Sequence, residues 1–241
     1  GATKIISVNQ NAGNYVDVLG GSSFWNRAAM TVSSNTSTSV AMRIQGASSQ
    51  SADILQVRDS GGTNLVRIQN TGEVLFESTA RHAKKIVLTA EYAGSVLDPG
   101  SGASNSGTMT SGLDLTNRMN YYKWTTALGT NQNYDVVAQV PIPSDFSAWG
   151  TNPLAITTYT TNTTNGTVTL EARDSSNTVQ CNFVSVTPGS TSTWATNNSA
   201  CTLAAGTYTA GDYMTLRIRM QSGTSGDTRI GNIVLNYLSK Y

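Results

Sequence analysis

The stretch Ala52–Phe76, ADILQVRDSGGTNLVRIQNTGEVLF, consists of short apolar runs separated by turn residues. The breaks fall at Asp59–Gly62 and at Thr71–Gly72. Alternating apolar residues bounded by Gly, Asp, Asn and Ser clusters predict short strands joined by tight turns. We therefore predict a β-hairpin unit here. Its packing residues are expected to be Ile54, Leu55, Val57, Leu65, Val66 and Ile68.

A related pattern lies upstream in residues 5–18, IISVNQNAGNYVDV. With one residue deleted in the turn it superposes on the hairpin unit, so two similar segments stand about 50 residues apart, which is typical of repeat architectures. Each copy has too few apolar residues to bury itself. We expect the missing neighbours in an upstream array or in sister chains wound about one axis.

The composition favours strands and turns and excludes several classes of protein. Charged residues make up 12% of the chain, against about 25% in average proteins. The net charge is +1 and no basic stripe occurs, so we expect no nucleic-acid partner. No run of about 18 apolar residues is present, and no membrane insertion is expected. The start GATKIIS lacks the basic and apolar regions of a signal peptide, so we expect either a mature product or, preferably, a cut fragment.

The phrase at residues 42–74, MRIQGASSQSADILQVRDSGGTNLVRIQNTGEV, resembles the short repeat in the shafts of phage tail fibres and long bacterial surface proteins. The shared features are a GAxSQ-type turn, a leucine-rich strand, a DSxGT turn and an NTGxV turn. The match covers about 35 residues well and the first 20 loosely. The resemblance implies an intertwined, homotrimeric β shaft.

A charged stretch, ESTARHAKK at residues 77–85, separates two composition regimes. We predict a shaft segment at 1–78, a linker at 79–85 and a head domain at 86–241. We expect the sole histidine, His82, to be a solvated linker side chain. Residues 98–112, DPGSGASNSGTMTSG, are expected to form an exposed loop.

The head shows about eight strand-like runs and no convincing helix. In residues 213–220, four apolar residues alternate with Thr215, Arg217 and Arg219, so the arginines are expected to point outward. Residues 230–238 are apolar on both faces, which suits a central or covered strand. We predict an all-β chain whose head is a jelly-roll-like antiparallel β-sandwich. The expected strands are 86–89, 121–126, 134–140, 154–160, 167–172, 179–186, 213–220 and 230–238.

Phrases along the head, such as KKIVLTAEYAGSVL at residues 84–97 and YDVVAQVPIPSDFSAW at 134–149, resemble the terminal globular domain of long, repeat-bearing surface or fibre-like proteins. This resemblance covers nearly all of residues 84–241. It implies a location at the end of a fibre and no particular activity.

The two cysteines, Cys181 and Cys201, both lie in the head. A bridge between them closes a loop of about 20 residues and contributes about 3 kcal/mol in the chain-entropy model. Two buried thiols or a metal pair are the alternatives, and no His or further Cys stands nearby for a metal. A disulfide implies an oxidising, extracellular setting.

Aromatic residues flanked by Asn and Thr are the best candidates for recognition, because aromatic rings stack on sugar rings while amides and hydroxyls bond their hydroxyl groups. The alternative is packing in the core or under loops. The candidate contacts to a glycan are Tyr121, Trp124, Trp149 and Trp194.

No constellation points to catalysis. There is no GxSxG motif, only one histidine, and no recognisable pair of carboxylates. We expect no cofactor, with a structural Ca²⁺ as a milder possibility. Its candidate ligands are the loop residues Asp98, Asp114, Asp212 and Asp227.

We interpret the chain as the distal part of an extracellular or virion fibre. It is expected to be a homotrimer that displays its head for attachment to a host or neighbouring cell-surface glycan or protein. The physical reason for a trimer is that three chains around one axis cover apolar strands and remove free sheet edges. One alternative is a self-assembling filament or shell subunit that exchanges an N-terminal strand. A polysaccharide-degrading, tailspike-like enzyme is a third.

Overall fold

The computed structural model describes residues 40, 42, 44–99, 105–186, 192–198, 202–204, 206–224 and 226–241. The chain divides into two compact units, residues 1–45 and 46–241. The first repeat, residues 5–18, lies outside the described residues. The second unit contains the hairpin unit and the head, while the predicted boundary near residue 78 stays a prediction.

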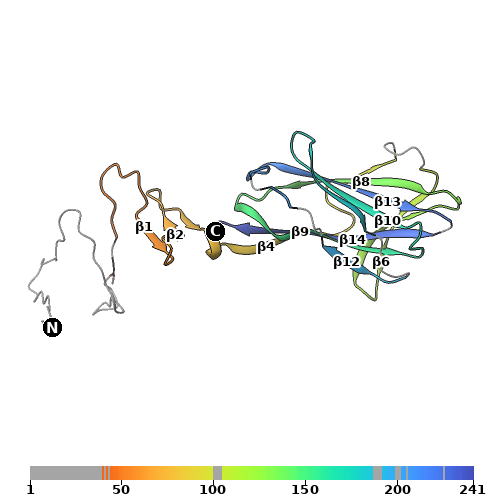
Figure 1. The fold of residues 1–241 in the computed structure, drawn as a ribbon, viewed down its shortest axis with the longest axis horizontal. Helices are drawn as coiled ribbons and strands as arrows, with labels where there is room; N and C mark the ends of the chain where they lie inside the picture. Colours follow the sequence, from red (N-terminus) through yellow and green to blue (C-terminus); the bar gives the residue numbers. More distant parts are fainter. Residues whose placement is uncertain are drawn as a thin grey trace, which may run out of the picture. The chain divides into compact units, whose positions relative to one another are not determined.

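The described chain is built almost entirely of strands (Figure 1). A small sheet contains β1 (Leu55–Arg58), β2 (Asn64–Ile68) and β3 (Val74–Phe76), followed by a single 3₁₀ turn, η1 (Ser78–Ala80). The remaining strands are β4 (His82–Leu88), β5 (Val96–Asp98), β6 (Thr108–Asp114), β7 (Met119–Thr125), β8 (Gln132–Pro141), β9 (Phe146–Thr160), β10 (Thr167–Arg173), β11 (Val179–Val186), β12 (Ala195–Asn198), β13 (Tyr213–Ser222) and β14 (Asp227–Ser239). Within the described ranges, no helical segment has the length and apolarity needed to span a membrane.

The turns of the hairpin unit are held by side chains close in sequence. Asp59 Oδ1 accepts hydrogen bonds from the backbone N–H of Gly61 and of Thr63, each at 2.9 Å. Gly62 has φ +84°, a left-handed conformation that glycine adopts without steric cost. In the preceding turn, Gln50 Oε1 accepts from the N–H of Ala47 at 2.9 Å. The small-residue turn and the DSGGT turn therefore have direct hydrogen-bonding roles.

One face of the small sheet is apolar. Leu55 pairs with Ile68, Val57 with Val66, Val66 with Phe76, and Ile68 with Val74. Cross-strand partners share a face, so these side chains lie together. Val57 and Val74 are 45% and 41% exposed within the chain.

The opposite face of the small sheet is polar. There Arg67 forms ion pairs with Asp53 at 3.2 Å and with Glu77 at 2.6 Å. Leu65 lies on this face as well, because it alternates with Val66. Ile54, which directly precedes β1, instead lines a surface hollow with residues of the 46–50 turn. Of the six predicted packing residues, Leu55, Val57, Val66 and Ile68 therefore share the apolar face.

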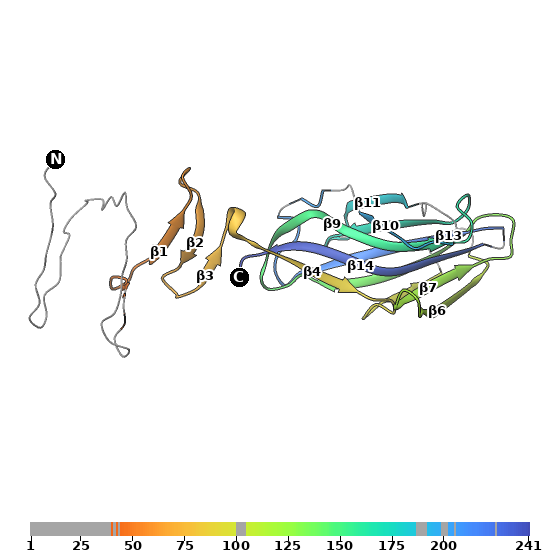
Figure 2. The same ribbon diagram turned by 90° about the horizontal axis from the view of Figure 1, so that it is seen from below.

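Two antiparallel sheets form the head, as Figure 2 shows from the side. The strand order is β11-β10-β13-β8-β5 in the five-stranded sheet and β12-β9-β14-β7-β6 in the six-stranded sheet, where β4 also pairs with β14. The predicted all-β class and antiparallel β-sandwich are confirmed. All eight expected strands overlap observed ones, and β14 is central, as its two apolar faces suggested.

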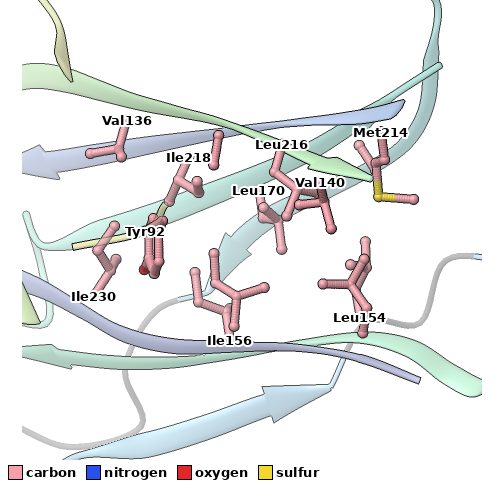
Figure 3. Packing of buried hydrophobic residues seen from close by; sticks show 14 of the residues in the cluster. Tyr92, Val136, Val140, Leu154, Ile156, Leu170, Met214, Leu216, Ile218 and Ile230 are labelled. Atoms are coloured by element: carbon pink, nitrogen blue, oxygen red, sulfur yellow. The ribbon is translucent and has the colours of Figure 1, made fainter. Parts of the chain in front are cut away.

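The core fills the space between the two sheets (Figure 3). From one sheet, Met214, Leu216 and Ile218 of β13 are fully buried, and from the other, Leu154 and Ile156 of β9 are fully buried. The predicted alternation of β13 is confirmed. Its outward arginines, Arg217 and Arg219, bind Asp135 of β8, which is 2% exposed.

Two segments differ from expectation. β4 begins at His82, inside the stretch expected to be a linker, because its residues pair with the last strand, Ser239 with His82 and Leu235 with Ile86. β6 begins at Thr108, inside the expected loop 98–112. It is an edge strand with mostly exposed side chains, so it lacks the apolar alternation that marks a strand in sequence. His82 is exposed, as expected, and its ring lies edge-on to Phe76 at 4.5 Å.

Candidate functional site

Three aromatic rings and one guanidinium gather on the outer face of the six-stranded sheet. We call Tyr121, Tyr159, Trp194 and Arg229 the aromatic cluster. The Trp194 ring lies 5.9 Å from the Tyr121 ring and 5.3 Å from the Tyr159 ring, measured between centroids. The Arg229 guanidinium carbon lies 5.0 Å from the Tyr121 centroid and 4.3 Å from the Tyr159 centroid. Both distances are within the range of cation–π attraction.

Strand alternation places each member of the cluster. Tyr159 in β9 and Arg229 in β14 each lie between two buried residues, and Tyr121 in β7 directly precedes the buried Tyr122. Arg229 pairs with Tyr159 on one side and with Lys123 on the other. Trp194 directly precedes β12, which pairs with β9 and so brings the indole over the face. Four separate segments therefore contribute to one surface.

Hydrogen bonds to carboxylates fix the orientation of the cluster. The indole N–H of Trp194 donates to Asp114 Oδ2 at 2.6 Å. Asp114 also accepts from the backbone N–H and the side-chain amide of Asn117, each at 3.0 Å. These bonds, those from Asn117 first, lower the pKa of Asp114 from 3.8 to about 2. The carboxylate is therefore ionised at neutral pH and remains an acceptor for Trp194.

A second carboxylate, that of Asp227, holds Arg229. Its Nε and Nη2 groups both donate to Asp227 Oδ2, at 3.0 and 2.7 Å. The Arg229 side chain is 21% exposed, so the guanidinium is reachable from solvent. All four members of the cluster are half-buried, which leaves part of each side chain available for contact.

Glycine at position 112 makes room for the Tyr121 ring. Gly112 pairs with Tyr121 across β6 and β7. A Cβ at this position would lie 2.7 Å from the Tyr121 hydroxyl oxygen and 2.8 Å from Cζ, closer than van der Waals contact allows. The ring therefore lies across the backbone of β6, and any larger residue at position 112 displaces it.

The structure separates the four predicted contact residues. Tyr121 and Trp194 meet in the cluster, whereas Trp124 is 1% exposed and its indole N–H donates to the Gln132 carbonyl at 2.9 Å. Trp124 is a core residue, and its assignment as a surface contact is corrected. Tyr121 and Trp124 are three apart on one strand, and an odd separation puts them on opposite faces.

Trp149 is also placed by packing. Its ring lies edge-on to Phe146 at 4.8 Å and to Tyr208 at 5.6 Å, and it covers one end of the core. Arg229 and Tyr159 were not among the residues predicted from the sequence. Lys123 was the available signal, because a lysine next to Tyr122 and Trp124 marks the outward face of β7, which Tyr121 shares.

Cys181 lies buried in β11 and has no free thiol. Cys201 lies outside the described residues, so the pairing of the two cysteines stays a prediction. Among the described residues, no group of three or more His, Cys, Asp or Glu could hold a metal ion. The Asp212 carboxylate accepts hydrogen bonds from Thr209, which closes a local turn.

No protein-family model matches the sequence, and no curated relative is found. The solved structures that match part of the chain include the following three. A tailspike domain of bacteriophage CBA120 has a TM-score of 0.39 and 12% identity over 61% of this chain and 19% of the tailspike chain, so this chain spans about a fifth of that protein. A family 11 carbohydrate-binding module of Clostridium thermocellum has a TM-score of 0.30 and 16% identity over 69% of this chain and 91% of the module.

The third is TmCBM61 in complex with β-1,4-galactotriose, with a TM-score of 0.30 and 11% identity over 65% of this chain and 88% of that chain. With TM-scores below 0.5 and identities this low, these likenesses support no statement about this chain. The functional argument therefore rests on the residues of this chain.

Proposed function

We propose that this chain is the distal part of an extracellular or virion fibre and that its β-sandwich head binds a glycan through the aromatic cluster. The observation that carries the proposal is the packing of Tyr121, Tyr159 and Trp194 around Arg229 on an exposed sheet face. The attachment partner is a host or neighbouring cell surface. The proposal assigns no catalytic step to the chain.

The cluster combines the two kinds of contact that sugars require. The axial C–H groups of a sugar ring pack on an aromatic face. The hydroxyl groups of the sugar need hydrogen-bond donors and acceptors at the edge of that face. Here Arg229 and Lys123 supply donors beside the rings. Asp114 and Asp227 fix Trp194 and Arg229 before any ligand arrives, which reduces the entropy lost on binding.

A binding panel tests the glycan proposal. Purified chain is screened on an array of neutral and acidic glycans, and hits are measured by calorimetry. Trp194→Ala is expected to weaken binding about fivefold to tenfold, because stacking of this kind contributes about 1–1.4 kcal/mol. Tyr213→Ala is the matched control, since Tyr213 is 54% exposed on the five-stranded sheet. Equal loss in both variants, or no binding to any glycan, contradicts the proposal.

The apolar face of the small sheet supports the homotrimer. A sheet that is apolar on one face must bury that face against another element. Within one chain Val57 and Val74 on this face stay largely exposed, while the polar face is completed by Arg67 and its two carboxylates. Three chains that bring their apolar faces to one axis cover these residues.

Light scattering of the whole chain tests the assembly. A trimer has three times the 25.4 kDa mass of one chain. Val57→Lys is expected to shift the mass toward the monomer, because burying an unpaired ammonium is costly. Gln56→Lys, the neighbour on the opposite face of β1, is the control and should keep the wild-type mass. Polymers that grow with concentration favour the filament alternative, and a wild-type monomer refutes both.

An enzymatic role is tested separately. Release of reducing sugar from a bound polysaccharide overturns the assignment of a purely adhesive role. Sustained binding without product supports it.

A further inference from the structure

Two cationic side chains lie next to each other beside the aromatic cluster. Lys123 stands directly opposite Arg229 in the ladder between β7 and β14, so two cations are adjacent on the same face. Like charges opposite each other on neighbouring strands destabilise a sheet. On its other side Lys123 faces Thr110, which carries no charge.

Only one carboxylate engages these two cations. Asp227 uses Oδ2 for Nε and Nη2 of Arg229. Asp114, the other nearby carboxylate, is engaged by Trp194 and Asn117. Within the described part of the chain, Lys123 forms no ion pair.

The remaining donors lie beside the rings. Nη1 of Arg229 carries two N–H groups that no described residue accepts, and the guanidinium stands between the rings of Tyr121 and Tyr159. Lys123 Nζ adds three donors from the adjacent strand. A single group with two acceptor oxygens and one negative charge satisfies both cations at once.

We propose that the preferred ligand of the aromatic cluster is a glycan whose sugar ring carries a carboxylate, as in uronic acids. This inference rests on the proposed glycan-binding function. The sugar ring stacks on Trp194 or a neighbouring tyrosine, and its carboxylate accepts hydrogen bonds from Arg229 Nη1 and Lys123 Nζ. The ligand thereby supplies acceptor oxygens for donors that the described residues of the protein leave unused.

The test compares the same oligosaccharide with its carboxylates free and with its carboxylates esterified. Oligogalacturonate, glucuronate-containing and mannuronate oligomers are each measured by calorimetry beside their methyl-esterified forms. At least one acid form is expected to bind ten times more tightly than its ester, and the difference should shrink as salt rises toward 1 M. Lys123→Gln should remove most of that tenfold difference, while Lys123→Arg keeps it.

The outcomes separate the two proposals. Equal affinity for acid and ester, or unchanged discrimination in Lys123→Gln, overturns the carboxylate inference and leaves glycan binding intact. Binding restricted to sulfated glycans also overturns it. Absence of binding to every acidic, esterified and neutral glycan overturns the proposed function itself, and the carboxylate inference with it.

Discussion

Replacement of Trp124 by Phe distinguishes a core role from a ligand role. The indole of Trp124 is 1% exposed, lies 4.9 Å from the ring of Tyr134, and donates to the carbonyl of Gln132 at 2.9 Å. Phe keeps one ring and loses both the second ring and the donor. The change therefore leaves a small cavity and one carbonyl without its partner.

The expected cost follows from these two losses. A cavity of about 40 Å³ at about 24 cal/mol per Å³ costs about 1 kcal/mol. The lost hydrogen bond adds about 1 kcal/mol. The total of about 2 kcal/mol corresponds to a fall in Tm of about 4–8 °C for a chain of this size. Glycan affinity should stay within a factor of two, because the side chain points away from the outer face.

Calorimetric unfolding and glycan titration of the same samples measure both quantities. Trp194→Phe is the matched comparison, because this tryptophan is half-buried and its donor bonds Asp114 at the surface. It should lose glycan affinity with a smaller change in Tm. The reasoning is refuted if Trp124→Phe binds glycan more weakly than wild type while its Tm is unchanged.

Three further outcomes are expected. Gly112→Ala should displace the Tyr121 ring and weaken glycan binding severalfold with little loss of stability, since the clashing atoms are the far end of a side chain; unchanged binding in a titration would contradict this. The pKa of Asp114 is lowered to about 2 in the folded chain, so its stabilising contribution is complete above about pH 4 and disappears as pH falls toward 2. In Asp114→Asn, the free energy of unfolding should therefore fall less between pH 4 and pH 2 than it does in the wild type. An equal fall in both proteins would count against this prediction. Thiol titration of denatured, unreduced chain should find no free sulfhydryl if Cys181 and Cys201 are bridged, whereas two thiols per chain remove that bridge.

The turns were predictable because their hydrogen bonds span only a few residues. Asp59 closes a turn by accepting from residues two and four further on, and Asp174 does the same for Ser176 and Thr178. The shared pattern Arg-Asp-Ser-x-x-Thr therefore forms the same hairpin in the small sheet and in the head. Gly62 and Asn177 occupy the left-handed position in the two turns.

The candidate site was only partly predictable. Tyr121 and Trp194 were selected for their residue type, and the same reasoning selected Trp124, which is buried. Residue type cannot separate these cases, because an aromatic ring serves a core and a sugar site equally well. Edge strand β6 was missed, because its mostly exposed residues lack the apolar alternation of a strand and so resemble a loop in sequence.

By itself, the sequence determined the all-β class, the hairpin turns and the inward and outward residues of β13, because each depends on residues close together in the chain. Tertiary structure alone decided that Tyr121, Tyr159, Trp194 and Arg229 form one surface. Alternation along a strand predicts which residues share a face of that strand. It does not predict which strands become neighbours in the sheet. That choice depends on the pairing of β14 with both β7 and β9, which joins segments far apart in the sequence through the packing of one common core.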